Sequence, residues 1–70
     1  MKVYRLTPFG LRIARSVRNP DTTAWRVIHF LDRMGGQATD DQMAEGTGLS
    51  VGDVGRIAGR LRVKHIVEEI

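Results

Sequence analysis

The chain has 70 residues, of which 41% are hydrophobic, so it can form one small domain around one core. A large enzyme cleft would remove hydrophobic core that so small a domain needs for its stability. It contains no cysteine, which excludes disulfide bonds and thiolate metal sites, and its net charge of +3 favours a polyanionic partner. No apolar run approaches the ~18 residues that span a membrane, and the first residues lack the apolar stretch of a signal peptide. We therefore expect a cytoplasmic protein with no membrane partner.

The charges are placed unevenly along the chain. Residues 1–20 carry +5 and residues 50–65 carry +3, whereas residues 21–49 carry −3 and residues 66–70 carry −2. Most of the basic residues are arginines, whose forked guanidinium groups match the geometry of phosphate. The two basic segments are candidates for contact with nucleic acid, and a solvated, arginine-rich surface is the alternative.

The N-terminal segment predicts a strand followed by a helix. Residues 3–6 alternate between apolar and polar side chains, which is typical of a short strand. Thr7 offers a hydroxyl N-cap and Pro8 suits the first helical position, so a helix is expected to run to about Arg18. The apolar stripe expected on this helix consists of Phe9, Ile13 and Val17.

A second helix is predicted between two chain breaks. Asn19-Pro20 ends the first helix, and an N-cap among residues 21–23 starts the next, which runs to about Met34. Gly35-Gly36 ends it, since glycine takes the left-handed cap conformation readily. The side chains expected to face the core are Trp25, Val27, Ile28 and Leu31.

Two more helices and a strand complete the prediction. Thr39 and Gln42 form a capping box for a short helix over about 40–46. Ser50 caps a fourth helix, with Asp53 favourably placed in its first turn. This helix is expected to end near Arg62, with Val63 on the outer face if it continued, and residues 66–70 read IVEEI, which predicts a closing strand.

The segment 40–61 has the pattern of two helices joined by a tight turn. Ala44 provides a small residue at the helix crossing, Gly48 lies in the turn, and Leu49 follows it as an apolar plug. The inward-facing residues of the second helix, at helical spacing, are Val54, Ile57 and Leu61.

This spacing resembles the helix-turn-helix of DNA-binding regulators. Together with the helix before it and the strand after it, residues 23–70 resemble the winged helix domain of bacterial and archaeal transcriptional regulators. The resemblance implies a mainly α (α+β) fold of three to four helices with a small two-stranded sheet. The whole chain, 1–70, is expected to form one such domain. Its parts are an N-terminal strand and basic helix at 1–20, the helix-turn-helix at 39–63 and the closing strand at 66–70.

The chain departs from this family in two ways. A winged helix has two strands after its recognition helix, whereas this sequence has one. The segment YRLTPFG at 4–10 resembles the Y-x-L-T-x-x-G segment that follows the wing in such regulators, but here it comes first. We therefore expect strand 3–6 to pair with strand 66–70 and to replace the missing partner. The alternatives are pairing between two chains and a chain that is one piece of a longer tandem protein.

The resemblance implies that helix 51–62 lies in the major groove of double-stranded DNA. Arg56 is expected to contact base edges, Arg60 either bases or phosphates, and Ser50 a phosphate. The glycines of this helix either let the DNA approach, permit tight helix packing or mark a dynamic helix. The candidate DNA-binding residues are Ser50, Gly52, Arg56, Gly59, Arg60, Arg62 and Lys64. The candidates for secondary phosphate contacts are Arg12, Arg15 and Arg18.

The expected function is double-stranded DNA binding by a transcriptional regulator, acting as a homodimer. No nucleophile–base constellation stands out, so we expect no enzymatic activity. His29 and His65 are far apart in sequence, so no metal site and no cofactor are expected. The alternatives are a protein–protein interaction module that docks a larger partner, and RNA binding through the basic N-terminal helix.

Overall fold

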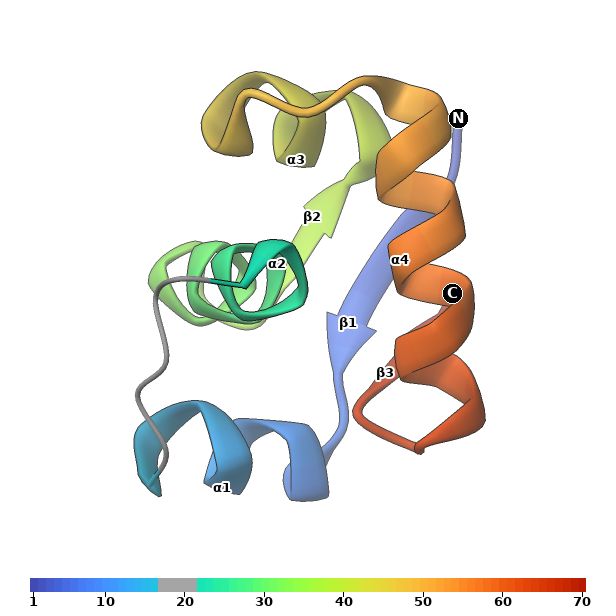
Figure 1. Ribbon diagram of the computed structural model, residues 1–70. Helices are drawn as coiled ribbons and strands as arrows, with labels where there is room; N and C mark the ends of the chain where they lie inside the picture. The colour runs from blue at the N-terminus through green and yellow to red at the C-terminus, as the bar shows by residue number, and fades with distance from the viewer. Residues whose placement is uncertain (17–21) are drawn as a thin grey trace.

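The first strand of the chain lies in the middle of the sheet. The computed structural model describes residues 1–16 and 22–70. In it, β1 (Val3–Leu6) pairs antiparallel with β2 (Gln37–Thr39) on one side and with β3 (Val67–Glu69) on the other, giving the order β2-β1-β3 (Figure 1). The pairing of β1 with β3 within one chain confirms the pairing expected for the two terminal strands. The expected two-stranded sheet was wrong, because β2 adds a third strand.

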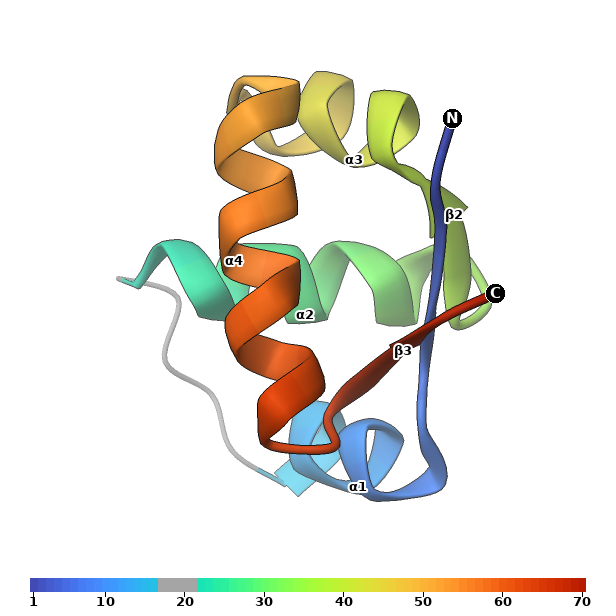
Figure 2. The same ribbon diagram turned by 90° about the vertical axis from the view of Figure 1, so that its right-hand side faces the viewer.

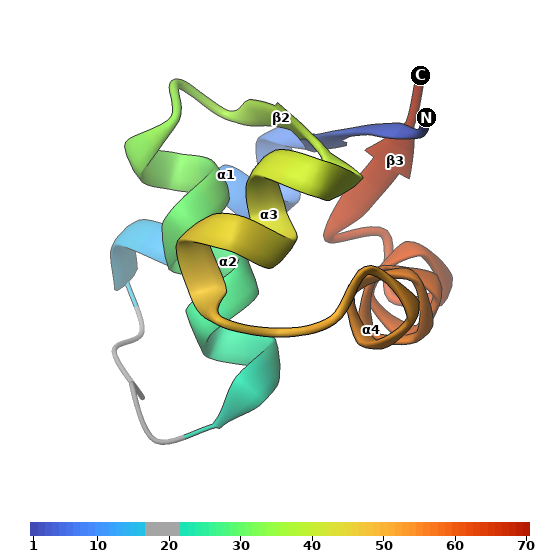
Figure 3. The ribbon, with the colours of Figure 1, turned by 90° about the horizontal axis from the view of Figure 1, so that it is seen from above.

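Helices cover one face of this sheet, as Figures 2 and 3 show. This arrangement confirms the mainly α (α+β) fold class. None of these helices has the length and apolar sequence needed to cross a membrane, within the residues described. Their bounds are α1 Pro8–Ser16, α2 Thr23–Arg33, α3 Asp40–Thr47 and α4 Val51–Val63.

The helix starts follow the caps in the sequence. The capping box of α3 is complete, with Gln42 N donating to Thr39 Oγ1 at 3.1 Å and Thr39 N donating to Gln42 Oε1 at 2.9 Å. Ser50 Oγ accepts from Asp53 N at 3.1 Å and starts α4. These bonds satisfy backbone N–H groups that lack a partner inside the helix. The predicted residues Val17, Arg18, Asn19, Pro20 and Asp21 lie outside the described part of the chain.

One hydrophobic core joins the sheet to the helices. Trp25, expected to face inward, is only partly buried. Val63 extends α4 by one residue beyond its predicted end and is 80% exposed, in agreement with its expected outward position. The side chains at the centre of the core, each at most 2% exposed, are Tyr4, Val27, Ile28, Leu31, Met43, Val54 and Val67.

The orientation of α1 differs from the prediction. The expected apolar stripe through Phe9 and Ile13 is not the buried face, since Phe9 is 48% exposed and the buried residues are Gly10 and Ala14. A Cβ on Gly10 would lie 1.9 Å from the carbonyl oxygen of Ile66, so only a residue without a side chain allows this approach. The small face of α1 therefore turns inward because the backbone before β3 lies directly against it.

The Y-x-L-T-x-x-G segment acquires a structural role at each of its defined positions. Tyr4 and Leu6 are buried on the core side of β1. The Thr7 hydroxyl donates to the carbonyl of His65 at 2.5 Å and accepts from Gly10 N at 2.9 Å. Through these two bonds of the Thr7 hydroxyl, the segment connects β1, α1 and the turn after α4.

Replacing Gly10 with alanine should lower the free energy of unfolding by about 3 kcal/mol, because the new Cβ must displace backbone rather than a flexible side chain. Urea denaturation followed by circular dichroism measures this loss. The matched control is Gly55→Ala, also within a helix, where a Cβ meets no atom within 4 Å. That variant should gain about 0.5–1 kcal/mol from the higher helix propensity of alanine. Equal stability of the two variants would contradict the close packing of α1.

Candidate nucleic-acid interface

Helices α3 and α4 meet across a tight turn. Gly48 adopts a left-handed conformation with φ of 78°, and its N–H donates to the carbonyl of Ala44 at 3.0 Å. This geometry ends α3 and turns the chain into α4 within three residues. Ala44 and Leu49 are partly buried against the core. The inward face of α4 is buried as expected at Val54, Ile57 and Leu61, and also at Ala58. The local geometry of the predicted helix-turn-helix is therefore present.

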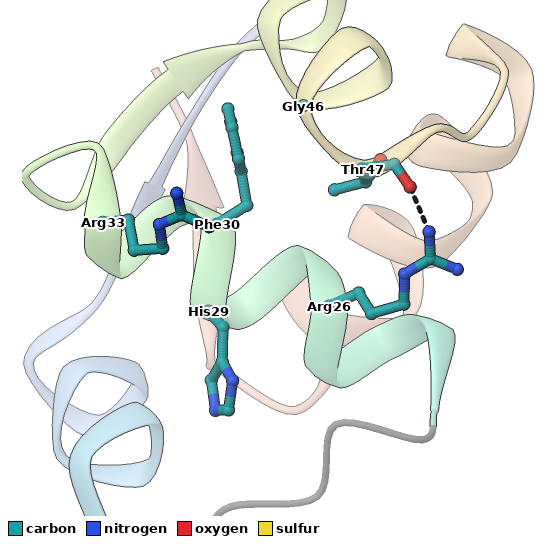
Figure 4. A pocket seen from close by; sticks show the side chains of 6 residues that line it. All are labelled: Arg26, His29, Phe30, Arg33, Gly46 and Thr47. Atoms are coloured by element: carbon teal, nitrogen blue, oxygen red, sulfur yellow. Dashed lines mark hydrogen bonds between the residues drawn. The ribbon is translucent and has the colours of Figure 1, made fainter.

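An arginine on α2 holds this turn in place. The guanidinium of Arg26 donates to the carbonyl of Thr47, the last residue of α3 (Figure 4). The Thr47 side chain is itself buried and donates to the carbonyl of Met43 at 2.5 Å. The sequence did not reveal this role for Arg26, because its partner is a backbone carbonyl distant in the chain.

The pocket in Figure 4 lies between α2 and the end of α3 and has a volume of about 220 Å³. Phe30 lines it and contacts Gly46, where a Cβ would lie 2.0 Å from the ring. His29 points away from Phe30, and its ring lies edge-on to Trp25 at a centroid distance of 5.6 Å. In the described residues, no group of three or more histidine or carboxylate side chains can hold a metal ion.

The exposed side of α4 carries a basic stripe, formed by Arg56, Arg60 and Lys64. These residues are four apart in sequence, so Arg56 and Arg60 lie on successive turns of one face of α4, and Lys64 follows them as its C-cap residue. Arg56 donates from Nη2 to Oδ1 of Asp53 at 2.7 Å. Neither Arg60 nor Lys64 has a carboxylate within 4.0 Å among the described residues. The positive charge of the stripe is therefore concentrated at its C-terminal end.

The structure separates Arg62 from the basic stripe. Its Nη1 donates to Oε1 of Glu69 at 3.2 Å, so Arg62 lies on the side of α4 that faces β3. Ser50 is engaged in capping α4, as described above. On α1, Arg12 and Arg15 are exposed, and Arg15 lies 3.9 Å from a carboxylate oxygen of Asp32. Arg18 lies outside the described residues. The described candidates therefore lie on the basic stripe of α4, on the side of α4 that faces β3, at the start of α4 and, as the secondary candidates, on α1.

The glycines of α4 leave part of its backbone uncovered. A Cβ on Gly55 or Gly59 would meet no atom within 4 Å, and one on Gly52 would meet only Ser50 Oγ at 3.9 Å. Tight packing within this chain therefore does not explain these glycines. Each glycine costs the helix up to about 1 kcal/mol relative to alanine.

Comparison with known proteins gives no family for the chain. No family model matches it, and neither a curated protein nor a solved structure shows a significant match. We therefore infer its function from the chemistry of the site.

Replacing Arg26 with alanine should lower the free energy of unfolding by about 1 kcal/mol, because the Thr47 carbonyl loses a charged donor. Hydrogen exchange at the Gly48 and Leu49 amides should accelerate more than exchange in the sheet. Arg33→Ala, on the same helix, serves as the control and should change stability by less than about 0.5 kcal/mol. A turn whose exchange is unaffected in Arg26→Ala would show that α2 does not hold it.

Proposed function

We propose that the protein binds double-stranded DNA with α4 in the major groove and acts as a transcriptional regulator. The observation that carries this proposal is the placement of a basic stripe on the exposed face of the second helix of a helix-turn-helix. An α-helix with its side chains is about 10–12 Å wide, and the major groove of B-DNA is about 12 Å wide. The fold thus offers a helix of the right size and charge.

Arg56 is the proposed reader of base edges. A guanidinium group has five N–H donors, and the bond to Asp53 leaves most of them available. Arginine binds the O6 and N7 atoms of guanine with two parallel hydrogen bonds. The Asp53 carboxylate limits the rotamers of Arg56, which lowers the entropy that Arg56 loses on binding. This pair therefore favours guanine at one position of the site.

The uncovered backbone of α4 supports a close approach of DNA to the helix. Gly52 and Gly59 lie near the centre of its outward face, and side chains there would hold the helix axis further from the bases. The same glycines leave few side chains that can read a sequence. We therefore propose modest sequence specificity for one copy of the chain, which a homodimer on two half-sites one helical turn apart would increase.

Arg56→Ala should remove the preference for guanine at one position, since the bidentate contact is lost. Sequences selected from a random duplex pool by the wild-type chain and by the variant provide the comparison. On the duplex preferred by the wild type, affinity should fall about tenfold or more. The control is Arg33→Ala, which removes one positive charge elsewhere and should preserve the preference. Selection of the same sequences by Arg56→Ala would refute the assignment, and a preference for single-stranded RNA over duplex DNA would favour RNA binding instead.

Gly59→Ala should change stability and affinity in opposite directions. The free energy of unfolding should rise by up to about 1 kcal/mol, because the added methyl group meets no atom of the chain and alanine favours the helix. The affinity for duplex DNA should fall, because the methyl group stands between α4 and the bases. Thermal denaturation and fluorescence anisotropy measure the two effects separately. An unchanged affinity would show that DNA does not approach the backbone at this position.

A further inference from the structure

We infer that the groove between the first turn of α2 and α4 seats the sugar–phosphate backbone of one DNA strand. This inference rests on the proposed function and extends it from the bases to a second site. It assigns Arg60 and Lys64 to phosphates and brings α2, which lies outside the helix-turn-helix, into the interface.

The groove has one basic wall and one hydroxyl-bearing wall. Arg56, Arg60 and Lys64 line it from α4, and Thr22 and Thr23 line it from the start of α2. Its volume is about 610 Å³. Figure 3 shows the start of α2 beside α4, and these two helices contact each other directly.

The floor of the groove is apolar. Ile57 and Leu61 contribute from α4, and Leu49 contributes from the turn. A nucleic acid backbone alternates charged phosphates with deoxyribose rings that have apolar faces. A groove with cations along its rim and aliphatic side chains below matches both components, whereas a surface of charges alone would match only the phosphates.

The residues of the groove that the structure describes carry more positive than negative charge. Asp53 is the one carboxylate among the described residues of its lining, and Arg56 already binds it at 2.7 Å. Arg60 and Lys64 therefore add two positive charges on one helix face, where like charges four residues apart repel each other. Phosphate oxygens would remove this repulsion with charge-assisted hydrogen bonds.

The spacing of the cations favours an extended polyanion over a compact anion. Arg56 and Lys64 are separated by about 12 Å along the axis of α4, at ~1.5 Å per residue. One small anion cannot contact both ends of such a stripe. A strand that flanks a helix in the major groove presents successive phosphates along a comparable path. We therefore assign the groove to DNA rather than to a small phosphorylated ligand.

The test compares two double variants with equal charge change. In Arg60→Gln/Lys64→Gln the two groove cations other than Arg56 are removed. In the control Lys2→Gln/Arg33→Gln two exposed cations, one before β1 and one on α2, are removed. Binding to a labelled random-sequence duplex is measured by fluorescence anisotropy over a series of salt concentrations. The slope of log affinity against log salt is negative, and its magnitude should decrease by about two in the groove variant. In the control it should stay near the wild-type value.

A third variant changes the affinity in the opposite direction. Asp53→Asn removes the carboxylate from the groove and releases Arg56, so affinity for random duplex should rise. A merely structural role of this residue would not strengthen binding. No rise in affinity, with folding intact by circular dichroism, would count against a phosphate in this groove.

The outcomes separate the inference from the proposed function. If the wild-type chain does not bind duplex even at low salt, both fail. If it binds and the two double variants lose the same slope, general charge attraction accounts for binding and the groove assignment is wrong. If the groove variant loses binding of inorganic phosphate but keeps the wild-type salt slope on the duplex, the groove holds a compact anion, and the assignment to a DNA strand is also wrong.

Discussion

The antiparallel pairing of β1 with both β2 and β3 is the constraint on which the rest of the structure depends. It places the side chains of Tyr4 and Leu6 in the core, where they cover the apolar faces of the helices. It also fixes where β3 starts, and therefore where the chain must leave α4. Because Gly10 allows α1 to lie against the Ile66 carbonyl, the same pairing seats α1 below the sheet. One central strand thus sets the positions of elements from both ends of the chain.

Helix α4 is held at both ends by contacts from outside the helix-turn-helix. Near its start, Arg26 of α2 binds the carbonyl that precedes the Gly48 turn. Near its end, the Thr7 hydroxyl binds the carbonyl of His65, which has a positive φ of 61°. A helix fixed in this way can present its outer face as a rigid surface. The outer face is free to carry glycines because stability comes from the inner face, where Val54, Ile57 and Leu61 are buried.

Local chemistry made much of the fold predictable, and tertiary contacts account for what was missed. The caps at Thr39 and Ser50 act within three residues, so the sequence alone located α3 and α4. The strand β2 has three residues, too few for an alternation pattern, and depends on β1 for its hydrogen bonds. The inward face of α1 depends on the close approach of Gly10 to the Ile66 carbonyl, which the spacing of apolar residues in the sequence does not indicate. The groove escaped prediction for the same reason, since one of its walls comes from α2.

The central position of β1 also has a consequence for the order in which the molecule forms. Arg5 and Glu68, which are ion-paired across β1 and β3, are 63 residues apart in sequence. Closing so long a loop lowers the entropy of the chain. The contacts between β1 and β3 offset this loss only when both strands are present. During translation, the helix-turn-helix emerges complete while β1 still lacks one neighbour. The sheet can therefore close only after β3 has been synthesised.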